Sequence, residues 1–130
     1  MSCILCDFVN KEKDCFQVWE DEHFLAFLDI NPINPGHTLL IPKQHASDVF
    51  DLPEDLYLRL FNTARVLAPV MKRAFDAPRI GLAIEGFGVD HVHIHLVPVH
   101  NSNELNPERA EAASKEELLA IQEKFRDSLN

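Results

Sequence analysis

Three histidines alternate with apolar residues in the segment His-Val-His-Ile-His-Leu-Val-Pro, residues 91–98. Side chains two positions apart lie on the same face of a β-strand, so the segment predicts a strand that carries three imidazoles on one face. Val92, Ile94 and Leu96 fall on the opposite face. Imidazoles crowded on one face repel one another when protonated, which favours a functional site over a solvated strand edge. Alternating histidines can also present two ligands to one metal ion.

The remaining chain predicts an α+β fold, in which an antiparallel β-sheet packs with one long central helix and a C-terminal helix. Two short strands are expected within residues 15–30, with an acidic turn at 20–22, and a third strand at 37–42. Two further strands are expected at 79–85 and 91–99, joined by a glycine-containing loop.

The long helix is predicted to begin near Asp51, because the spacing from Asp51 to Glu54 matches a capping box, and Pro69 is expected to kink it. Apolar residues recur along this helix at spacings of three and four, at Leu56, Leu60, Ala64, Leu67, Met71 and Phe75. Residues 101–113 have no regular pattern. A second capping box at Ser114 opens the final helix, whose apolar side carries Leu118, Ile121, Phe125 and Leu129.

The composition bounds the class of protein. The chain has 130 residues and a net charge of −9, so we expect one domain over residues 1–130 and no broad basic face for nucleic acid. It contains no run of about 18 apolar residues, so no membrane span is expected. The N-terminus lacks the basic and apolar regions of a signal peptide, which predicts a cytoplasmic protein.

The chain has three cysteines, Cys3, Cys6 and Cys15. An odd number of cysteines without a secretory signal favours metal binding or free thiols over a disulfide framework. Cys3 and Cys6 have the spacing of a metal-binding pair.

Two blocks of sequence resemble the histidine triad (HIT) family. The upstream block runs from Phe27 to His45, the downstream block is the alternating-histidine segment, and the likeness extends from about Cys3 to Val99. Within the family, the chain is more similar to the zinc-containing Hint-like proteins than to the Fhit branch. The resemblance implies a HIT-like fold and a hydrolase that acts at the α-phosphate of a nucleoside phosphoramidate or dinucleoside polyphosphate. The reaction would pass through a covalent nucleotidyl-histidine intermediate.

By this resemblance, His93 is the nucleophile and His95 binds and polarises the phosphate. His37 matches the upstream histidine of the family and approaches the same catalytic site from a neighbouring strand. A neutral imidazole is a competent nucleophile near pH 7 when an acceptor holds its other nitrogen. We expect a backbone carbonyl near the preceding loop to be that acceptor.

The resemblance also assigns the nucleotide contacts. Asp29 matches the position that hydrogen-bonds the ribose hydroxyls, and a carboxylate accepts well from a vicinal diol. Phe27, Leu28 and Ile30 are expected to line the base pocket. The implied ligand is a small AMP-containing molecule, with no organic cofactor.

The pair Cys3 and Cys6, together with His45 and His91, reproduces the ligand set of the zinc-bearing members. Two thiolates and two imidazoles suit tetrahedral zinc, and four protein ligands leave no open position. The resemblance therefore implies a structural zinc ion that fastens the N-terminus to the active-site strand.

The chain departs from the family pattern before the triad. Hint and Fhit proteins carry a Gly-Gln-Ser/Thr-type segment there, whereas residues 86–90 contain neither glutamine nor a hydroxyl. The backbone N–H groups of Gly88 and Val89 are expected to substitute as phosphate donors. Asp90 is an unfavourable neighbour for a phosphate unless it points away, and Ile84 stands where Hint-like proteins carry an asparagine.

Three alternatives remain open from the sequence: a nucleotidyl transferase or phosphorylase of the same family, a non-catalytic nucleotide-binding protein, and a hydrolase whose triad holds a catalytic metal. The family likeness also implies a homodimer that joins two sheets into one.

Overall fold

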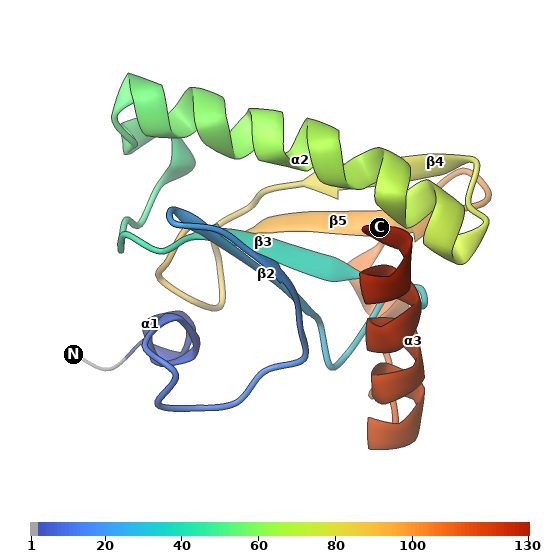
Figure 1. Cartoon of the computed structure of the whole chain (residues 1–130). Helices are drawn as coiled ribbons and strands as arrows, with labels where there is room; N and C mark the ends of the chain where they lie inside the picture. Colours follow the sequence, from blue (N-terminus) through green and yellow to red (C-terminus); the bar gives the residue numbers. More distant parts are fainter. Residues whose placement is uncertain (1–2) are drawn as a thin grey trace.

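The computed structural model describes residues 3–130 (Figure 1). Five antiparallel strands form one sheet in the order β1-β2-β3-β5-β4. Their bounds are Gln17–Glu20 for β1, Phe24–Leu28 for β2, Thr38–Pro42 for β3, Arg79–Ala83 for β4 and Ile94–Val99 for β5. The helices are α1 (Ile4–Val9), α2 (Glu54–Phe75) and α3 (Lys115–Ser128), and short 3₁₀ turns span Val49–Asp51 and Pro107–Arg109. The α+β class predicted from the sequence is confirmed.

Helices α2 and α3 cover one face of the sheet, as Figure 1 shows. The predicted stripe of α2 faces the sheet, and Leu60, Leu67 and Met71 are fully buried. Ile94 and Leu96 of β5 enter the same core. The imidazoles and the apolar residues of the histidine segment therefore lie on opposite faces, as predicted, and the structure shows that the apolar face packs against α2.

The short helix α1, for which the sequence carries no clear pattern, packs on the opposite face of the sheet. Leu5 is buried there together with Leu25 and Phe27 of β2, and the rings of Phe8 and Phe27 meet edge to face at 5.1 Å. The Cys3 Sγ atom accepts a hydrogen bond from the Cys6 N–H at 3.4 Å and so caps this helix.

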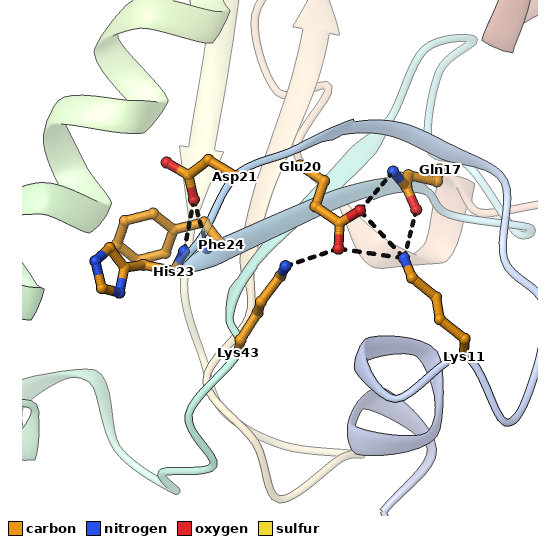
Figure 2. Close-up of polar contacts among 7 residues, drawn as sticks. All are labelled: Lys11, Gln17, Glu20, Asp21, His23, Phe24 and Lys43. Carbon is orange, nitrogen blue, oxygen red and sulfur yellow. Dashed lines mark hydrogen bonds and ion pairs between the residues drawn. The ribbon is translucent and has the colours of Figure 1, made fainter.

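A polar cluster fastens the segment after α1 to the sheet (Figure 2). The Glu20 carboxylate at the end of β1 accepts from Lys43 at 2.7 Å and from Lys11 at 3.2 Å, and Lys11 also donates to Gln17. These charge-assisted bonds hold the pKa of Glu20 below its usual range. The cluster joins the N-terminal segment, β1 and the end of β3.

Several boundaries differ from the sequence predictions. Asp51 does not cap α2: it lies in a 3₁₀ turn capped by Asp48, and α2 begins after Pro53, whose extended backbone separates the two elements. The predicted cap at Ser114 is confirmed, since its side chain accepts from the Glu117 N–H at 3.1 Å. Helix α2 runs without a break through Pro69.

Strand β5 begins at Ile94, three residues later than predicted. The reason lies in the backbone: the Val92 N–H bonds to the carbonyl of Ala46, and the His91 N–H bonds to the carbonyl of Val89. These bonds draw residues 91–93 out of the sheet ladder. Within residues 3–130, no helix combines the length and apolar character needed to cross a membrane.

Candidate active site and metal centre

The imidazole of His93 is held by the main chain. Its Nδ1 lies 2.7 Å from the carbonyl oxygen of His91, and the side chain is only 7% exposed. A carbonyl only accepts, so in the neutral ring Nδ1 carries the proton and Nε2 keeps an unshared electron pair. This is the arrangement that the sequence predicted for a nucleophile, with the holder now identified as the carbonyl of His91.

His37, in the turn before β3, fixes the tautomer of His95. The Ile33 N–H donates to His37 Nδ1 at 3.0 Å, so the proton of a neutral His37 sits on Nε2. That Nε2 lies 2.9 Å from His95 Nδ1, which accepts and leaves the His95 proton on Nε2. The chain of hydrogen bonds thus makes His95 Nε2–H a donor.

Both of these imidazoles are neutral at pH 7. Burial lowers the pKa of His37 to about 4, with Asp29 opposing the shift and His95 adding to it. Burial also lowers the pKa of His95, an effect reinforced by His93 and opposed by Asp29 and Glu85. At pH 7 these two imidazoles therefore act through hydrogen bonds and not as cations.

The histidines line a hollow of about 360 Å³. His93 and His95 are adjacent in it, with ring centroids 5.2 Å apart. Besides the three histidines, the hollow is lined by Asp29, Asn31, Ile33, Ala83, Glu85, Phe87, Val97, Leu105, Pro107 and Ala110. The last three come from the segment in which the sequence showed no pattern.

A second, largely apolar hollow of about 390 Å³ lies between α1 and β2. Its lining includes Leu5, Phe8, Phe27, Leu28 and Ile30. The three residues expected at a base pocket, 27, 28 and 30, therefore line one hollow together with residues of α1.

Asp29 lines both hollows and so lies at their junction. One carboxylate oxygen accepts from the Asn31 N–H at 2.8 Å, and the other lies 3.6 Å from His37 Nε2. Each oxygen can accept further hydrogen bonds.

The loop after β4 turns away from the histidines. Phe87 lines the histidine hollow, but Gly88 and Val89 line a separate groove beside Cys3 and Cys6. Asp90 lines that groove too. The structure thus does not place the two expected phosphate donors with the histidines, and it directs the unfavourable carboxylate of Asp90 elsewhere.

Cys3, Cys6, His45 and His91 form a compact cluster, with their ligand atoms within 4.8 Å of one another. His91 Nδ1 lies 3.5 Å from each sulfur and 3.2 Å from His45 Nδ1, and Cys6 Sγ lies 3.3 Å from His45 Nδ1. His91 Nε2 donates to the Pro42 carbonyl at 2.8 Å, which leaves Nδ1 free for a metal. The four residues form a candidate metal centre.

Asp29, His37 and His95 also lie within ligand distance of one another. However, His37 Nδ1 is occupied by the Ile33 N–H, and His37 Nε2 is engaged with His95 Nδ1. Because these nitrogens already satisfy one another, the geometry favours a hydrogen-bonded array over a catalytic metal in the triad.

Sequence reasoning missed the polar network that shapes the far wall of the histidine hollow. Buried Asn34 donates to the Pro98 carbonyl at 2.8 Å and accepts from Arg109 at 3.0 Å. Glu104 accepts from the His100 N–H, which together with further hydrogen bonds lowers its pKa to about 2. The hydrogen-bonding partners are up to 75 residues apart, so no local sequence pattern predicts them.

Comparison with known proteins agrees with this geometry. The HIT domain family matches residues 10–102 of this chain. The uncharacterized HIT-like protein of Methanocaldococcus jannaschii is 40% identical over 100 residues, which cover 74% of this chain and 78% of that protein. Adenosine 5′-monophosphoramidase HNT1 of Saccharomyces cerevisiae is 36% identical over 98 residues, covering 75% of this chain and 62% of the yeast protein.

Solved structures with a similar fold also belong to this family. A zinc-bound histidine triad family protein from Mycobacterium smegmatis superposes with a TM-score of 0.85 at 30% identity, covering 99% of this chain and 94% of that chain. A Hit-like protein from Bartonella henselae gives a TM-score of 0.87 at 27% identity, covering 98% and 96%. With the match over residues 10–102, these likenesses confirm the resemblance seen in the sequence: this chain belongs to the HIT domain family.

Proposed function

We propose that this protein is a nucleotide hydrolase that cleaves nucleoside phosphoramidates or dinucleoside polyphosphates at the α-phosphate. The observation that carries the proposal is the hydrogen bond from His93 Nδ1 to the His91 carbonyl. In the neutral ring this bond leaves the electron pair of Nε2 free, in a hollow shared with two neutral imidazoles. The similarity to a yeast adenosine 5′-monophosphoramidase supports this class of reaction.

The two hollows suit the parts of one nucleotide. The base would lie in the apolar hollow against Phe27, Leu28 and Ile30, and the ribose hydroxyls would donate to Asp29 at the junction. The α-phosphate would then lie at the histidines. We infer this order of base, ribose and phosphate because Asp29, the residue expected to contact the ribose, lines both hollows.

In the first step, His93 Nε2 bonds to the α-phosphorus as the bond to the leaving group breaks. His95 Nε2–H donates to the phosphate and offsets the charge that develops there. When the leaving group is an amine, its nitrogen takes up one proton relayed from solvent. In the second step, water attacks phosphorus, the bond to Nε2 breaks, one proton returns to solvent and the nucleoside monophosphate is released.

The test is release of AMP from adenosine 5′-phosphoramidate by the wild type, His93→Ala and His100→Ala. His100 is a matched control because it is a histidine outside both hollows. We expect the wild type and the control to release AMP and His93→Ala to lose turnover by several orders of magnitude. Equal release by His93→Ala would exclude His93 as the nucleophile. Binding of AMP by the wild type, with no turnover by any of the three proteins, would establish the non-catalytic alternative. Transfer to phosphate or another acceptor would identify a phosphorylase or transferase.

We further propose that the cluster of Cys3, Cys6, His45 and His91 holds a structural zinc ion. Tetrahedral zinc, with bonds of about 2.3 Å to sulfur and 2.05 Å to nitrogen, separates a sulfur and a nitrogen ligand by about 3.6 Å and two nitrogen ligands by about 3.3 Å. The corresponding distances here are 3.3–3.5 Å and 3.2 Å. Cys3, Cys6 and Cys15 form no disulfide, and unpaired cysteines are typical of reducing compartments, which supports a cytoplasmic location.

We also infer a homodimer that extends the sheet across β4. Strand β4 lies at one edge of the sheet and exposes Leu82, and the outer side of α2 exposes Leu58 and Val66. Unpaired strand edges and exposed apolar side chains favour association. Sedimentation as a monomer at micromolar concentration would overturn this inference.

A further inference from the structure

We propose that Asn34 is a positioning residue that selects, through His37, the tautomer in which His95 can donate a hydrogen bond to a phosphate. The proposal rests on the hydrolase function proposed above, because it concerns the histidine that would donate to the phosphate in that reaction.

The pair of His37 and His95 has two tautomeric arrangements that keep the same hydrogen bond. The rings are joined through His37 Nε2 and His95 Nδ1, which lie 2.9 Å apart. In the first arrangement, His37 Nε2–H donates to His95 Nδ1, so the proton of His95 lies on Nε2. In the second, His95 Nδ1–H donates to His37 Nε2, so the proton of His37 lies on Nδ1 and Nε2 of His95 has only an electron pair. Burial lowers the pKa of both rings, so each carries one proton at pH 7 and the neutral pair can adopt either arrangement.

The first arrangement is the one that suits a phosphate. His95 lines the histidine hollow next to His93, where the α-phosphate would lie. A phosphate oxygen accepts hydrogen bonds, so it binds the Nε2–H of the first arrangement and is repelled by the electron pair of the second. The competent form of the site is therefore the one with the His95 proton on Nε2.

The turn before β3 selects between the two arrangements. The Ile33 N–H donates to His37 Nδ1 at 3.0 Å. This bond is lost in the second arrangement, where two N–H groups would face each other. The Asp29 carboxylate, 3.6 Å from His37 Nε2, also favours the first arrangement, although this distance exceeds that of a hydrogen bond. The tautomer therefore depends chiefly on where the turn holds the Ile33 N–H.

Asn34, the next residue, holds that part of the turn. It is 8% exposed, and its carbonyl accepts from the His37 N–H at 3.1 Å. Its side-chain amide donates to the Pro98 carbonyl at 2.8 Å and to the Glu104 carboxylate at 3.2 Å, and its side-chain oxygen accepts from Arg109 at 3.0 Å. One buried side chain thus has partners on three other segments of the chain.

These bonds fasten the turn to the strand that carries the second imidazole. Pro98 lies on β5, as does His95. Beyond β5, residues 107–113 run beside residues 30–34 and are held there by backbone hydrogen bonds. Loss of the Asn34 amide would leave the Pro98 carbonyl without this donor and would free the turn to move away from β5.

The test is the tautomer of His95, read from the nitrogen NMR signals of the imidazole rings in nucleotide-free protein at pH 7. These signals distinguish the ring nitrogen that carries a proton from the one that carries an electron pair. The proteins compared are the wild type, Asn34→Ala and Asn62→Ala, with His95→Gln to assign the signals. Asn62 is the matched control, because it lies exposed on α2 and also accepts hydrogen bonds from an arginine, Arg65.

We expect the wild type and the control to hold His95 as the Nε2–H tautomer. In Asn34→Ala the second arrangement should be populated to about a third or more, because the bond from Ile33 is the main difference between the two. His93 should keep its proton on Nδ1 in every protein, since the His91 carbonyl holds it independently.

The same fraction should appear in binding and turnover. A ligand that needs one of two states binds more weakly in proportion to the fraction of that state, so the Kd of AMP should rise by about 1.5-fold or more in Asn34→Ala. The kcat/KM for release of AMP from adenosine 5′-phosphoramidate should fall by the same factor. Addition of AMP to Asn34→Ala should return His95 to the Nε2–H tautomer.

The outcomes separate this proposal from the function on which it rests. A lower unfolding temperature in Asn34→Ala with an unchanged His95 tautomer would show that Asn34 only stabilises the fold, and would overturn the proposal while leaving the hydrolase intact. Absence of turnover by the wild type would overturn the hydrolase, but the tautomers of the free proteins would still decide the role of Asn34.

A milder variant covers the case in which Asn34→Ala does not fold. Arg109→Met removes the donor to the Asn34 oxygen and leaves the amide in place. We expect a smaller but measurable population of the second arrangement in this protein. A wild-type His95 tautomer in folded Arg109→Met would then reject the proposal.

Discussion

The carbonyl oxygen of His91 accepts the Nδ1–H of His93 at 2.7 Å, while the ring of His91 belongs to the cluster of Cys3, Cys6 and His45. His91 thus contacts the proposed nucleophile, His93, through its main chain and the candidate metal centre through its side chain. Its remaining ring nitrogen donates to the Pro42 carbonyl at 2.8 Å. The cluster and the Pro42 carbonyl hold the two nitrogens of the His91 ring, and the His91 carbonyl in turn holds the His93 ring. The orientation of the His93 ring therefore depends on an intact cluster.

Loss of one thiol should therefore lower both metal content and stability. We expect the wild type to contain about one equivalent of zinc, and Cys6→Ser to lose most of it and to unfold about 10 °C lower or more, because metal binding to such a site is coupled to folding. Cys15→Ser is the control, since Cys15 lies outside the cluster. Metal analysis and thermal unfolding decide the matter: less than a tenth of an equivalent in the wild type, with no loss of stability in Cys6→Ser, would remove the zinc proposal.

Asp29 should contribute to affinity through the ribose. We expect Asp29→Asn to weaken AMP binding by about 1–2 kcal/mol, because the amide group of asparagine has only one accepting oxygen and carries no charge. The wild type should also bind AMP more tightly than 2′-deoxy-AMP, and this difference should shrink in Asp29→Asn. Calorimetric titration of the four combinations measures the coupling, and an equal preference for AMP in both proteins would show that Asp29 does not contact the 2′-hydroxyl.

Stability should fall with pH in the window set by His37. The unfolded histidine binds a proton near its ordinary pKa of 6.5, whereas burial lowers the pKa of the folded residue to about 4. Between these values the unfolded state binds more protons, so the free energy of unfolding decreases as pH falls from about 6.5 to about 4, by on the order of 2–3 kcal/mol. Buried His95 shifts in the same direction.

Replacing His37 isolates its share of this effect. His37→Gln should be less stable at pH 7 and should lose less stability than the wild type on acidification to pH 4.5, as measured by urea unfolding. Glu104 acts in a separate window, because its folded pKa of about 2 removes stability only as pH falls below its ordinary value of 4.5. Identical pH profiles above pH 5 in the wild type and His37→Gln would contradict the assignment.

Gly36 should tolerate no side chain in the turn before His37. Its φ is +93°, and a Cβ atom there would lie 2.7 Å from the ring of Phe75 at the end of α2. Gly88 has a similar φ of +86° but open space around it. Gly88→Ala should therefore cost about 1–2 kcal/mol for the backbone alone, and Gly36→Ala about 1–2 kcal/mol more for the clash. Chemical denaturation measures both, and addition of Phe75→Leu to Gly36→Ala should recover part of the difference.

The sequence predicted best where a periodic pattern meets a large buried surface. The spacing along α2 identified Leu60, Leu67 and Met71 as core. The alternation at residues 91–96 predicted that the imidazoles and the apolar side chains lie on opposite faces, and this holds even where the strand ladder ends. Alternation depends on an extended backbone and not on ladder hydrogen bonds, so it survives the shortening of β5.

Capping signals were less reliable, because the same spacing succeeded at Ser114 and failed at Asp51. At Asp51 an intervening Pro53 keeps the chain extended for one residue more, and Asp51 joins a turn of its own. The number of positions between two residues does not determine the backbone dihedral angles of the chain that joins them. The same limitation applies to Gly88, which lies in a loop with positive φ that leads away from the histidines.

The far wall of the histidine hollow could not be predicted, because long-range contacts hold it in place. Asn34 binds Pro98, Glu104 and Arg109, all more than 60 residues away. A segment stabilised by such partners has no periodicity of its own to reveal it. Leu105, one of the residues that this network positions, covers Gly81 of β4 so closely that a Cβ there would lie 2.9 Å from it.

Helix α1 has six residues, too few to persist as a helix in isolation. One of its sides carries Cys6 into the thiol and imidazole cluster, and the other presents Leu5 and Phe8 to the apolar hollow against Phe27. A ligand bound on either side requires the same short helix to be folded. We therefore expect metal binding at the sulfurs and nucleobase binding in the apolar hollow to be thermodynamically linked, with each strengthening the other by the same factor.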